Sequence, residues 1–196
     1  MTTTTKALTP QTAAFLIQPD AKLRDSFLEA MAEHDAVDGR PDADGLTLAD
    51  LRSGDCVDCY VSGLIDGTAL RPGTEPLRCT AWWYVTDTPQ GRRYIGRASL
   101  RHHPATSTLG EFGSQLWVTV RPSERRQGYG RALLSAALPF ARANGIEDAV
   151  IELDRTNEVG RRLIESLGAQ QIAHRPAEQR GRHRYRLTTV RADQDL

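Results

Sequence analysis

The segment that most constrains the fold spans residues 115–145, which read QLWVTVRPSERRQGYGRALLSAALPFARANG. Its pattern predicts an apolar strand, a loop with glycines and an amphipathic helix that begins near Gly128. The first turn of a helix has amide groups without intrahelical partners, at the positive end of the helix dipole. This helix start carries no acid but has Arg125, Arg126 and Arg131, each of which the dipole disfavours by roughly 0.3–1 kcal/mol. A bound polyanion would make the arginines favourable at this helix start, so the segment predicts a diphosphate-binding loop.

Other interpretations of the same loop fit its residues less well. Gly128 and Gly130 would let the backbone approach a ligand closely, although two glycines alone are also typical of a flexible loop end. A Walker loop requires Lys and then Ser or Thr after its last glycine, where Arg131 and Ala132 stand. The dinucleotide fingerprint would place its third glycine at Leu133. The arginines and the flanking strand and helix therefore favour the diphosphate interpretation.

Two blocks of the chain together resemble a known family. In the first block Arg125, Gly128 and Gly130 follow the order RxxGxG, and in the second a helical pattern spans residues 157–168. These blocks resemble motif A and a later motif of the GNAT superfamily, the acyl-CoA-dependent N-acyltransferases. The likeness extends from about residue 13 to 190, is strongest over 93–169, and is similar to a bacterial subgroup of longer acetyltransferases. The further matching residues are Val120, Pro122, Arg126, Tyr129, Ala132 and Leu133 in the first block, and Asn157, Leu163, Glu165, Leu167 and Gly168 in the second.

The resemblance implies a GNAT-like α/β fold, with a mixed, mostly antiparallel sheet, one splayed parallel pair of strands and flanking helices. We expect a single domain over residues 13–190 between short tails at 1–12 and 191–196. Hydrophobic periodicity and turn residues independently predict the elements. The expected strands are 13–17, 79–86, 93–101, 114–120, 149–154, 169–173 and 183–190, and the expected helices follow Asp20 and span 47–64, 128–144 and 158–167.

The resemblance also implies where acetyl-CoA, the acyl donor, would bind. Strands 114–120 and 149–154 would splay apart to form a notch, and the backbone of Val118 and Val120 would pair with the pantetheine. The diphosphate would rest on the amides of residues 126–131, and Asn157 would bond to the pantetheine or adenosine side. The full set of expected donor contacts is Val118, Val120, Arg125, Arg126, Gln127, Gly128, Tyr129, Gly130, Arg131 and Asn157. No metal or redox cofactor is expected.

The general base is less well defined by the sequence. The family often places a glutamate on or beside the strand before the loop, which favours Glu111. Glu152 and Asp154, at the end of the parallel strand, are alternatives, and His102 or His103 could relay the proton through water. Each of these residues also has an ordinary structural interpretation, as a strand start, a loop cap or a solvated side chain.

Two positions depart from the family pattern. Many members protonate the leaving thiolate with a tyrosine in the second block, where this chain has Ile164. The thiolate would then be protonated by water or leave as the anion. Gly160 stands where relatives often carry a small hydroxyl residue, which puts one pantetheine contact in doubt.

Composition limits the other classes of function. The chain has 196 residues with 25 acids and 25 bases, so zero net charge gives no reason to expect nucleic acid as a partner. The N-terminal segment contains neither a signal peptide's apolar core nor a membrane span, which predicts a cytoplasmic protein. Three cysteines predict reduced thiols, and the lone CVDC is expected on a helix with buried side chains rather than on a metal.

The acceptor can be inferred only from charge. Residues 33–58 carry eight acids against two arginines, in a region that usually borders the acceptor pocket in this superfamily. A cationic acceptor fits this run, and a solvated acidic surface fits it equally. The resulting hypothesis is an N-acetyltransferase for a primary amine of a small molecule. Its alternatives are a protein amine acetyltransferase, a catalytically silent acyl-CoA-binding module and RNA binding near Arg180, and a homodimer stays open.

Overall fold

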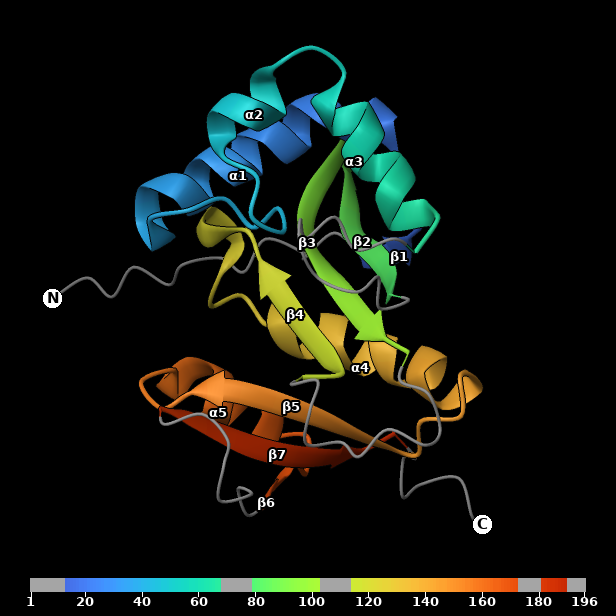
Figure 1. The fold of residues 1–196 in the computed structure, drawn as a ribbon, viewed down its shortest axis with the longest axis vertical. Helices are drawn as coiled ribbons and strands as arrows, with labels where there is room; N and C mark the ends of the chain where they lie inside the picture. The colour runs from blue at the N-terminus through green and yellow to red at the C-terminus, as the bar shows by residue number, and fades with distance from the viewer. Residues whose placement is uncertain (1–12, 68–78, 103–113, 173–180, 190–196) are drawn as a thin grey trace, which may run out of the picture.

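The computed structural model describes residues 13–67, 79–102, 114–172 and 181–189 (Figure 1). The order of elements agrees with the sequence predictions over these residues, with most boundaries shifted by one to three positions. The strands are β1 (Ala14–Ile17), β2 (Cys79–Thr88), β3 (Gly91–Arg101), β4 (Leu116–Val120), β5 (Asp148–Asp154), β6 (Gln170–Ile172) and β7 (Arg182–Thr188). The α-helices are α1 (Arg24–Asp38), α2 (Leu48–Arg52), α3 (Cys56–Ile65), α4 (Tyr129–Ala143) and α5 (Glu158–Glu165), with short 3-10 turns at Ala21–Leu23 and Pro122–Glu124.

Four antiparallel strands in the order β1-β2-β3-β4 form the first sheet, which has helices on both faces (Figure 1). Side chains alternate between the faces along each strand. Tyr84 and Leu100 pack with α4 on one face, whereas Trp83 and Tyr94 pack with α1 and α3 on the other. The sheet thus separates two hydrophobic clusters and holds β4 at one of its edges.

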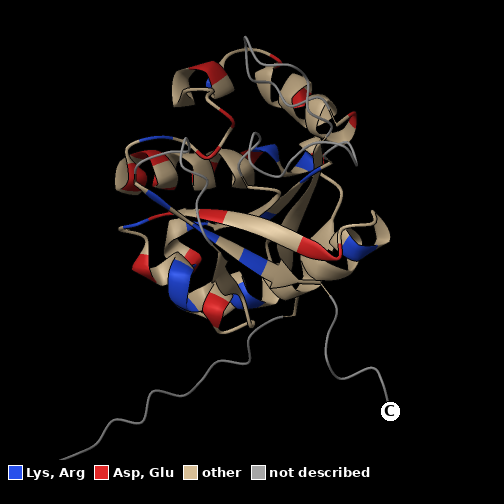
Figure 2. Ribbon diagram, turned by 60° about the horizontal axis from the view of Figure 1, so that its bottom comes forward, with Lys and Arg blue, Asp and Glu red and all other residues tan. Residues whose placement is uncertain are grey.

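Three strands in the order β5-β7-β6 form a second sheet, also antiparallel. Ile151 of β5 and Tyr185 of β7 join the hydrophobic cluster of α4, so this helix contacts both sheets. The other face of the sheet is polar, and Figure 2 shows acidic positions of β5 beside basic positions of β7. The mixed α/β GNAT-like fold expected from the sequence is therefore confirmed. The expectation of one mixed sheet is wrong over the described residues, because β4 and β5 are not paired as a ladder and the strands form two antiparallel sheets.

Helix starts follow the predicted local signals. Thr47, at the predicted start of the helix over 47–64, forms a capping box with Asp50 at α2, and Asp20 accepts a hydrogen bond from the amide of Lys22 at the first 3-10 turn. The predicted single helix to Leu64 is wrong in one respect, because the chain turns at Ser53 and divides it into α2 and α3.

The cysteines of the CVDC segment lie on α3 as expected, but the expectation that they are buried is wrong. Cys56 is half-buried, Cys59 is exposed, and both are free thiols. The buried residues of this helix are Val57, Tyr60, Val61 and Gly63.

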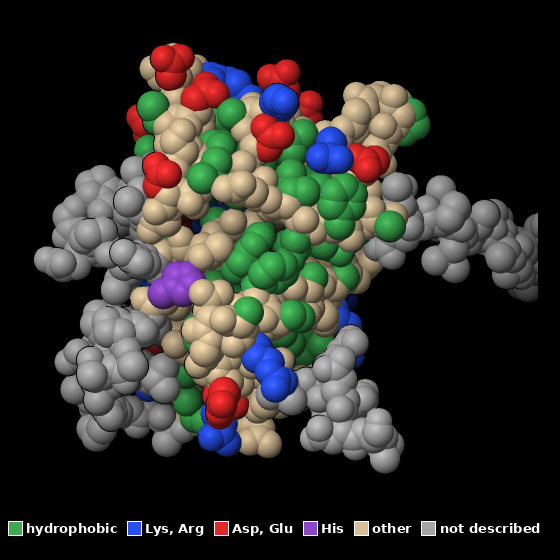
Figure 3. All heavy atoms as spheres, turned by 90° about the vertical axis from the view of Figure 1, so that its right-hand side faces the viewer, with side chains coloured by type: hydrophobic (Ala, Val, Ile, Leu, Met, Phe, Trp, Pro, Cys, Tyr) green, Lys and Arg blue, Asp and Glu red, His purple; other side chains and the backbone are tan. Residues whose placement is uncertain are grey.

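The surface on the side of β1 and the end of α4 carries a group of hydrophobic side chains (Figure 3). Phe15 of β1 and Phe140 of α4 are among the exposed large hydrophobic residues, and Trp82 packs on Phe140 with ring centroids 4.8 Å apart. No helix in the described parts of the chain is long and apolar enough to cross a membrane.

Candidate functional site

In the described parts of the chain, one edge of β4 has no strand paired along most of its length. The amides of Arg121 and Arg101 donate to the carbonyls of Ile95 and Gln115, which fixes the register of β4 against β3. Because hydrogen bonding alternates along an antiparallel strand, the even-numbered residues direct their NH and C=O groups to the opposite edge. Val118 and Val120 therefore present these groups on the side that faces away from β3.

β5 approaches this open edge only near the start of β4. The amide of Gln115 donates to the carbonyl of Val150 at 2.8 Å, and the amide of Glu152 donates to the Ser114 hydroxyl at 3.3 Å. Beyond this point the two strands belong to different sheets and diverge toward their carboxyl ends (Figure 1). The result is a V-shaped arrangement in which, within the described residues, the NH and C=O of Val118 and the NH of Val120 have no backbone partner.

A loop of residues 121–128, called here the 121–128 loop, connects the end of β4 to α4. Gly128 is the N-cap of α4 with φ 86°, and it offers no side-chain acceptor to the first turn. Arg126 is exposed and also has a left-handed backbone, with φ 65°. No acid lies in the first turn of α4. The uncapped amides and the helix dipole together make this helix start a favourable place for an anion.

The three arginines at this helix start differ in their surroundings. Arg125 donates to Asp38 and to the carbonyl of Val120, and Arg131 donates to the carbonyl and hydroxyl of Ser166 at the end of α5. Among the described residues, only Arg126 of the three has no hydrogen bond or ion pair of its side chain. Two of the three arginines thus have acidic, carbonyl or hydroxyl partners within the protein, and their predicted contact with a bound anion stays a prediction.

The two glycines of the RxxGxG pattern also act differently. A Cβ built on Gly128 meets nothing within 4 Å, so this position faces open space. A Cβ on Gly130 would lie 3.3 Å from the side chain of Leu163, so Gly130 allows α4 to pack closely on α5. Tyr129 is buried and packs edge-on against Tyr84, with ring centroids 6.2 Å apart. Gly128 is therefore the glycine that is placed for close approach of a ligand.

Asn157 lies at the start of α5, where its Oδ1 accepts a hydrogen bond from the amide of Gly160 at 2.8 Å. A Cβ on Gly160 would come within 2.8 Å of the Asn157 side chain. The glycine in place of a hydroxyl residue thus has a structural cause, since it makes room for the capping asparagine. The Nδ2 group of Asn157 has no acceptor among the described residues.

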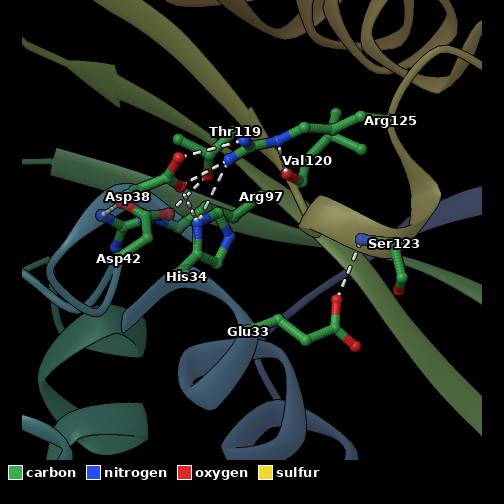
Figure 4. A network of polar contacts seen from close by, with 9 residues as sticks. All are labelled: Glu33, His34, Asp38, Asp42, Arg97, Thr119, Val120, Ser123 and Arg125. Carbon is green, nitrogen blue, oxygen red and sulfur yellow. Dashed lines mark hydrogen bonds and ion pairs between the residues drawn. The ribbon is translucent and has the colours of Figure 1, made fainter. Parts of the chain in front are cut away.

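Acids of α1 and of the turn that follows it contact β4 and the 121–128 loop (Figure 4). Glu33 bonds to Arg121, Asp38 bonds to Arg125, and Asp42 accepts from the Thr119 hydroxyl. These contacts were not predicted from the sequence, where their only signal is that an acidic run and an arginine-rich loop occur in one chain.

The arrangement has clear matches among known proteins. Residues 66–169 match the model of the acetyltransferase (GNAT) family. This chain belongs to the GNAT family. A mycothiol acetyltransferase from Thermobispora bispora is 39% identical over 67 residues, which are 34% of this chain and 23% of that protein. The chain thus matches about a quarter of the length of this curated relative.

Solved structures of GNAT proteins share the fold at low sequence identity. A candidate GNAT-family acetyltransferase from Bordetella pertussis superposes with a TM-score of 0.60 at 14% identity, covering 94% of this chain and 100% of that one. The candidate acetyltransferase yncA from Salmonella typhimurium, solved with its cofactor acetyl-CoA, gives a TM-score of 0.54 at 18% identity over 92% and 96% of the chains.

The candidate bases of this GNAT protein lie in different surroundings. Glu111 and His103 lie outside the described residues, and His102 bonds to the Thr80 hydroxyl at 2.7 Å. The Oδ1 of Asp154 accepts from the hydroxyl and amide of Thr156, and these bonds lower the pKa of its carboxyl. An exposed carboxylate with a lowered pKa and a local partner is a weak base.

Glu152 is better placed than Asp154. Its side chain is only 9% exposed, and its carboxylate lies 3.4 Å from Arg184 and 3.8 Å from Arg182. Its amide bonds to Ser114 at the point where β4 and β5 begin to diverge. Of the acids predicted as the general base, Glu152 is thus the one that the described structure places where β4 and β5 begin to diverge.

Ile164, at the position where many GNAT proteins have a tyrosine, is buried in the hydrophobic cluster of α4. It packs there with the apolar residues of both sheets and supplies no proton. Within the described ranges, no group of three or more His, Cys, Asp or Glu residues is arranged to hold a metal ion.

Proposed function

We propose that this protein transfers an acetyl group from acetyl-CoA to a primary amine of a small molecule, by direct attack in a ternary complex. The observation that carries the proposal is the open edge of β4, followed directly by the 121–128 loop and the uncapped start of α4. The loop has left-handed backbone at Arg126 and Gly128. An extended chain of amides and a diphosphate would find complementary groups along this path, in the order in which they occur in CoA.

The donor would use backbone groups more than side chains. The NH and C=O of Val118 and the NH of Val120 would pair with the amides of pantetheine, as an added strand pairs with a sheet edge. The carbonyl of Val120 already accepts from Arg125. The amides of residues 126–131 and the Arg126 guanidinium would hold the diphosphate, and the Asn157 Nδ2 group would donate to the pantetheine or adenosine side.

The chemistry requires alignment, polarisation of one carbonyl and removal of one proton. The amine nitrogen would attack the thioester carbon, a backbone NH of β4 would stabilise the oxyanion, and the C–S bond would then break to release CoA. Glu152 or Glu111 would accept the proton of the amine. Because Ile164 cannot donate a proton, the thiolate would leave as the anion or take its proton from water.

A cationic acceptor is supported by a partly exposed charged cluster beside β4. Asp42 and Asp44 both pair with the guanidinium of Arg97, and Asp42 also accepts from the Thr119 hydroxyl, so two carboxylates lie beside β4. The two carboxylates are 18% and 16% exposed, so a solvated amine could reach them. The name of the Thermobispora bispora relative, mycothiol acetyltransferase, also supports a small acceptor rather than a protein.

A catalytically silent acyl-CoA-binding module is a second candidate, and buried Ile164 favours it because no proton donor occupies that position. Thiol release from acetyl-CoA in the presence of a panel of amines separates the two candidates. Release that depends on one class of amine supports the transferase. Tight binding of acetyl-CoA without release by any amine supports the silent module.

The substitution Gly128→Val tests the donor site directly. A β-branched residue at φ 86° is strained, and its side chain would extend into the space beside the helix start. We expect calorimetry to show no binding of CoA or acetyl-CoA by this variant, while circular dichroism shows a folded protein. Unchanged affinity in a folded Gly128→Val protein would contradict the proposed site.

A further inference from the structure

The acids of α1 and the turn that follows it run alongside the end of β4 and the 121–128 loop. Figure 4 shows contacts from Asp42 to Thr119, from Glu33 to Ser123 and from Asp38 to Arg125. Glu33 also contacts Arg121. The two segments are far apart in sequence, with 87 positions between Asp38 and Arg125. These acids are therefore built into the support of the loop, rather than being only a solvated surface.

The Asp38 contact fixes the position of the Arg125 side chain. Two guanidinium nitrogens of Arg125 donate to the two carboxylate oxygens of Asp38, at 3.0 Å and 2.5 Å. Paired hydrogen bonds of this kind restrict both distance and orientation. The third nitrogen, Nε, donates to the carbonyl of Val120 at 3.2 Å. One guanidinium thus links α1, the last residue of β4 and the loop.

The Glu33 contact fixes the backbone of the loop. One oxygen of Glu33 accepts from the Arg121 guanidinium at 2.7 Å, and the other accepts from the amide of Ser123 at 2.9 Å. Arg121 is buried, with 4% of its surface exposed. Partial burial would raise the pKa of Glu33, but the hydrogen bonds from Arg121 and Ser123 outweigh this and lower it to about 2. The carboxylate is therefore charged whenever the protein is folded near neutral pH.

The conformation of the loop needs such support. Arg126 has a left-handed backbone with φ 65°, a conformation that is strained for a residue with a side chain. A strained residue keeps this conformation only when its neighbours are held in place. Asp38 holds Arg125 on one side, and on the other side Tyr129 is fixed in the hydrophobic cluster.

We propose that Asp38 and Glu33 are positioning residues for acetyl-CoA, which hold the 121–128 loop so that its amides face the diphosphate. The inference rests on the proposed function. Neither side chain touches the donor. They act through Arg125, Arg121 and Ser123, and they lower the cost of ordering the loop when the diphosphate binds.

The test compares binding of acetyl-CoA by the wild-type protein and by Asp38→Asn, Glu33→Gln and Asp35→Asn, using calorimetry. Asp35 is an exposed acid of the same helix without a side-chain contact among the described residues, so Asp35→Asn is a matched control. We expect Asp38→Asn and Glu33→Gln each to weaken binding about tenfold, and Asp35→Asn to bind as the wild type does. Equal affinity of Asp38→Asn and Asp35→Asn would overturn the proposal.

A second ligand separates positioning from a general loss of structure. S-acetylpantetheine has the thioester and the pantetheine amides but no diphosphate, and its weak binding can be followed by ligand-observed NMR. Positioning of the diphosphate loop predicts that Asp38→Asn binds S-acetylpantetheine with wild-type affinity. An equal loss for both ligands would show that the variant disturbs the whole site, and would reject the positioning role.

Binding of acetyl-CoA by the wild-type protein separates a failure of the positioning role from a failure of the proposed function. If the wild-type protein does not bind acetyl-CoA, the proposed function fails whatever the variants do. If the wild-type protein binds acetyl-CoA and Asp38→Asn binds it equally well at an unchanged melting temperature, only the positioning role fails.

Discussion

Replacement of Arg97 by methionine tests the buried charge cluster that joins β3 to the turn after α1. The Arg97 side chain is 1% exposed and donates two hydrogen bonds to Asp42, two to Asp44 and one to the Tyr60 hydroxyl. Burial alone would lower the pKa of Arg97, but the two carboxylates outweigh it and hold the pKa above its usual value. The guanidinium is thus charged, and it is the counter-charge for both acids.

The expected cost follows from the carboxylates that are left behind. Removing one partner of a buried ion pair typically costs about 3–5 kcal/mol, because the other charge stays without compensation. Asp42 and Asp44 keep 18% and 16% of their side-chain surface exposed, so water can partly replace the guanidinium. We therefore expect Arg97→Met to lower the free energy of unfolding by about 3 kcal/mol, the lower end of that range. For a chain of this length this is a fall in melting temperature of about 6–12 °C.

Urea denaturation and thermal unfolding measure this loss. Arg92→Met is the control, since the ion pair of Arg92 with Asp87 has side chains 41% and 62% exposed and should contribute at most about 1 kcal/mol. Adding Asp42→Asn and Asp44→Asn to Arg97→Met should recover at least about 1 kcal/mol, because the two carboxylates that lost the guanidinium are then neutral amides. A loss below about 1 kcal/mol for Arg97→Met, or no recovery in the triple variant, would refute the reasoning.

Three further predictions concern the loop, β4 and the base. The pKa of Glu33 is lowered from 4.5 to about 2, so the charged carboxylate stabilises the fold above pH 4.5 and this contribution is lost as pH falls toward 2. Wild-type protein should exceed Glu33→Gln in unfolding free energy by about 1–2 kcal/mol at pH 6 and by nothing near pH 2, and a constant difference would contradict this assignment. A Cβ on Gly96 would lie 2.2 Å from the carbonyl oxygen of Thr119, so Gly96→Ala should displace β4, cost about 2–3 kcal/mol in urea denaturation and weaken acetyl-CoA binding. An unchanged urea midpoint would contradict this expectation, because it would show that β4 moves away from the added Cβ without a loss of stability. Glu152→Gln should lower kcat about 10²–10⁴-fold if Glu152 is the base, whereas Asp154→Asn should change kcat little, and retained activity in Glu152→Gln would transfer the role to Glu111.

Local patterns in the sequence predicted most of the elements. Leu23, Phe27 and His34 recur at helical spacing, and they form the buried face of the first 3-10 turn and α1. The Thr47 capping box likewise gives the start of α2. Such signals depend on residues within one or two turns of each other, so they can be interpreted before the topology is known.

The elements of the proposed donor site were predictable to the same extent. The run from β4 through the 121–128 loop into α4 is continuous in sequence, and the lack of acids at the helix start follows from the residues alone. The sequence could not show which of the three arginines at the helix start have partners within the protein. Arg125 and Arg131 have partners on α1 and α5, and only the folded chain brings those helices to the loop.

By itself the sequence determined the strand, loop and helix on which the proposed donor site lies, because the periodicity and the dipole argument involve neighbouring residues only. Tertiary structure alone decided that the acids of residues 33–44 brace β4 and its loop. Ion pairs between residues 53 to 88 positions apart leave no periodic signal, since their formation depends on how the sheet and α1 pack together. The same packing decided that Ile164 is buried and that Glu152 lies where β4 and β5 part.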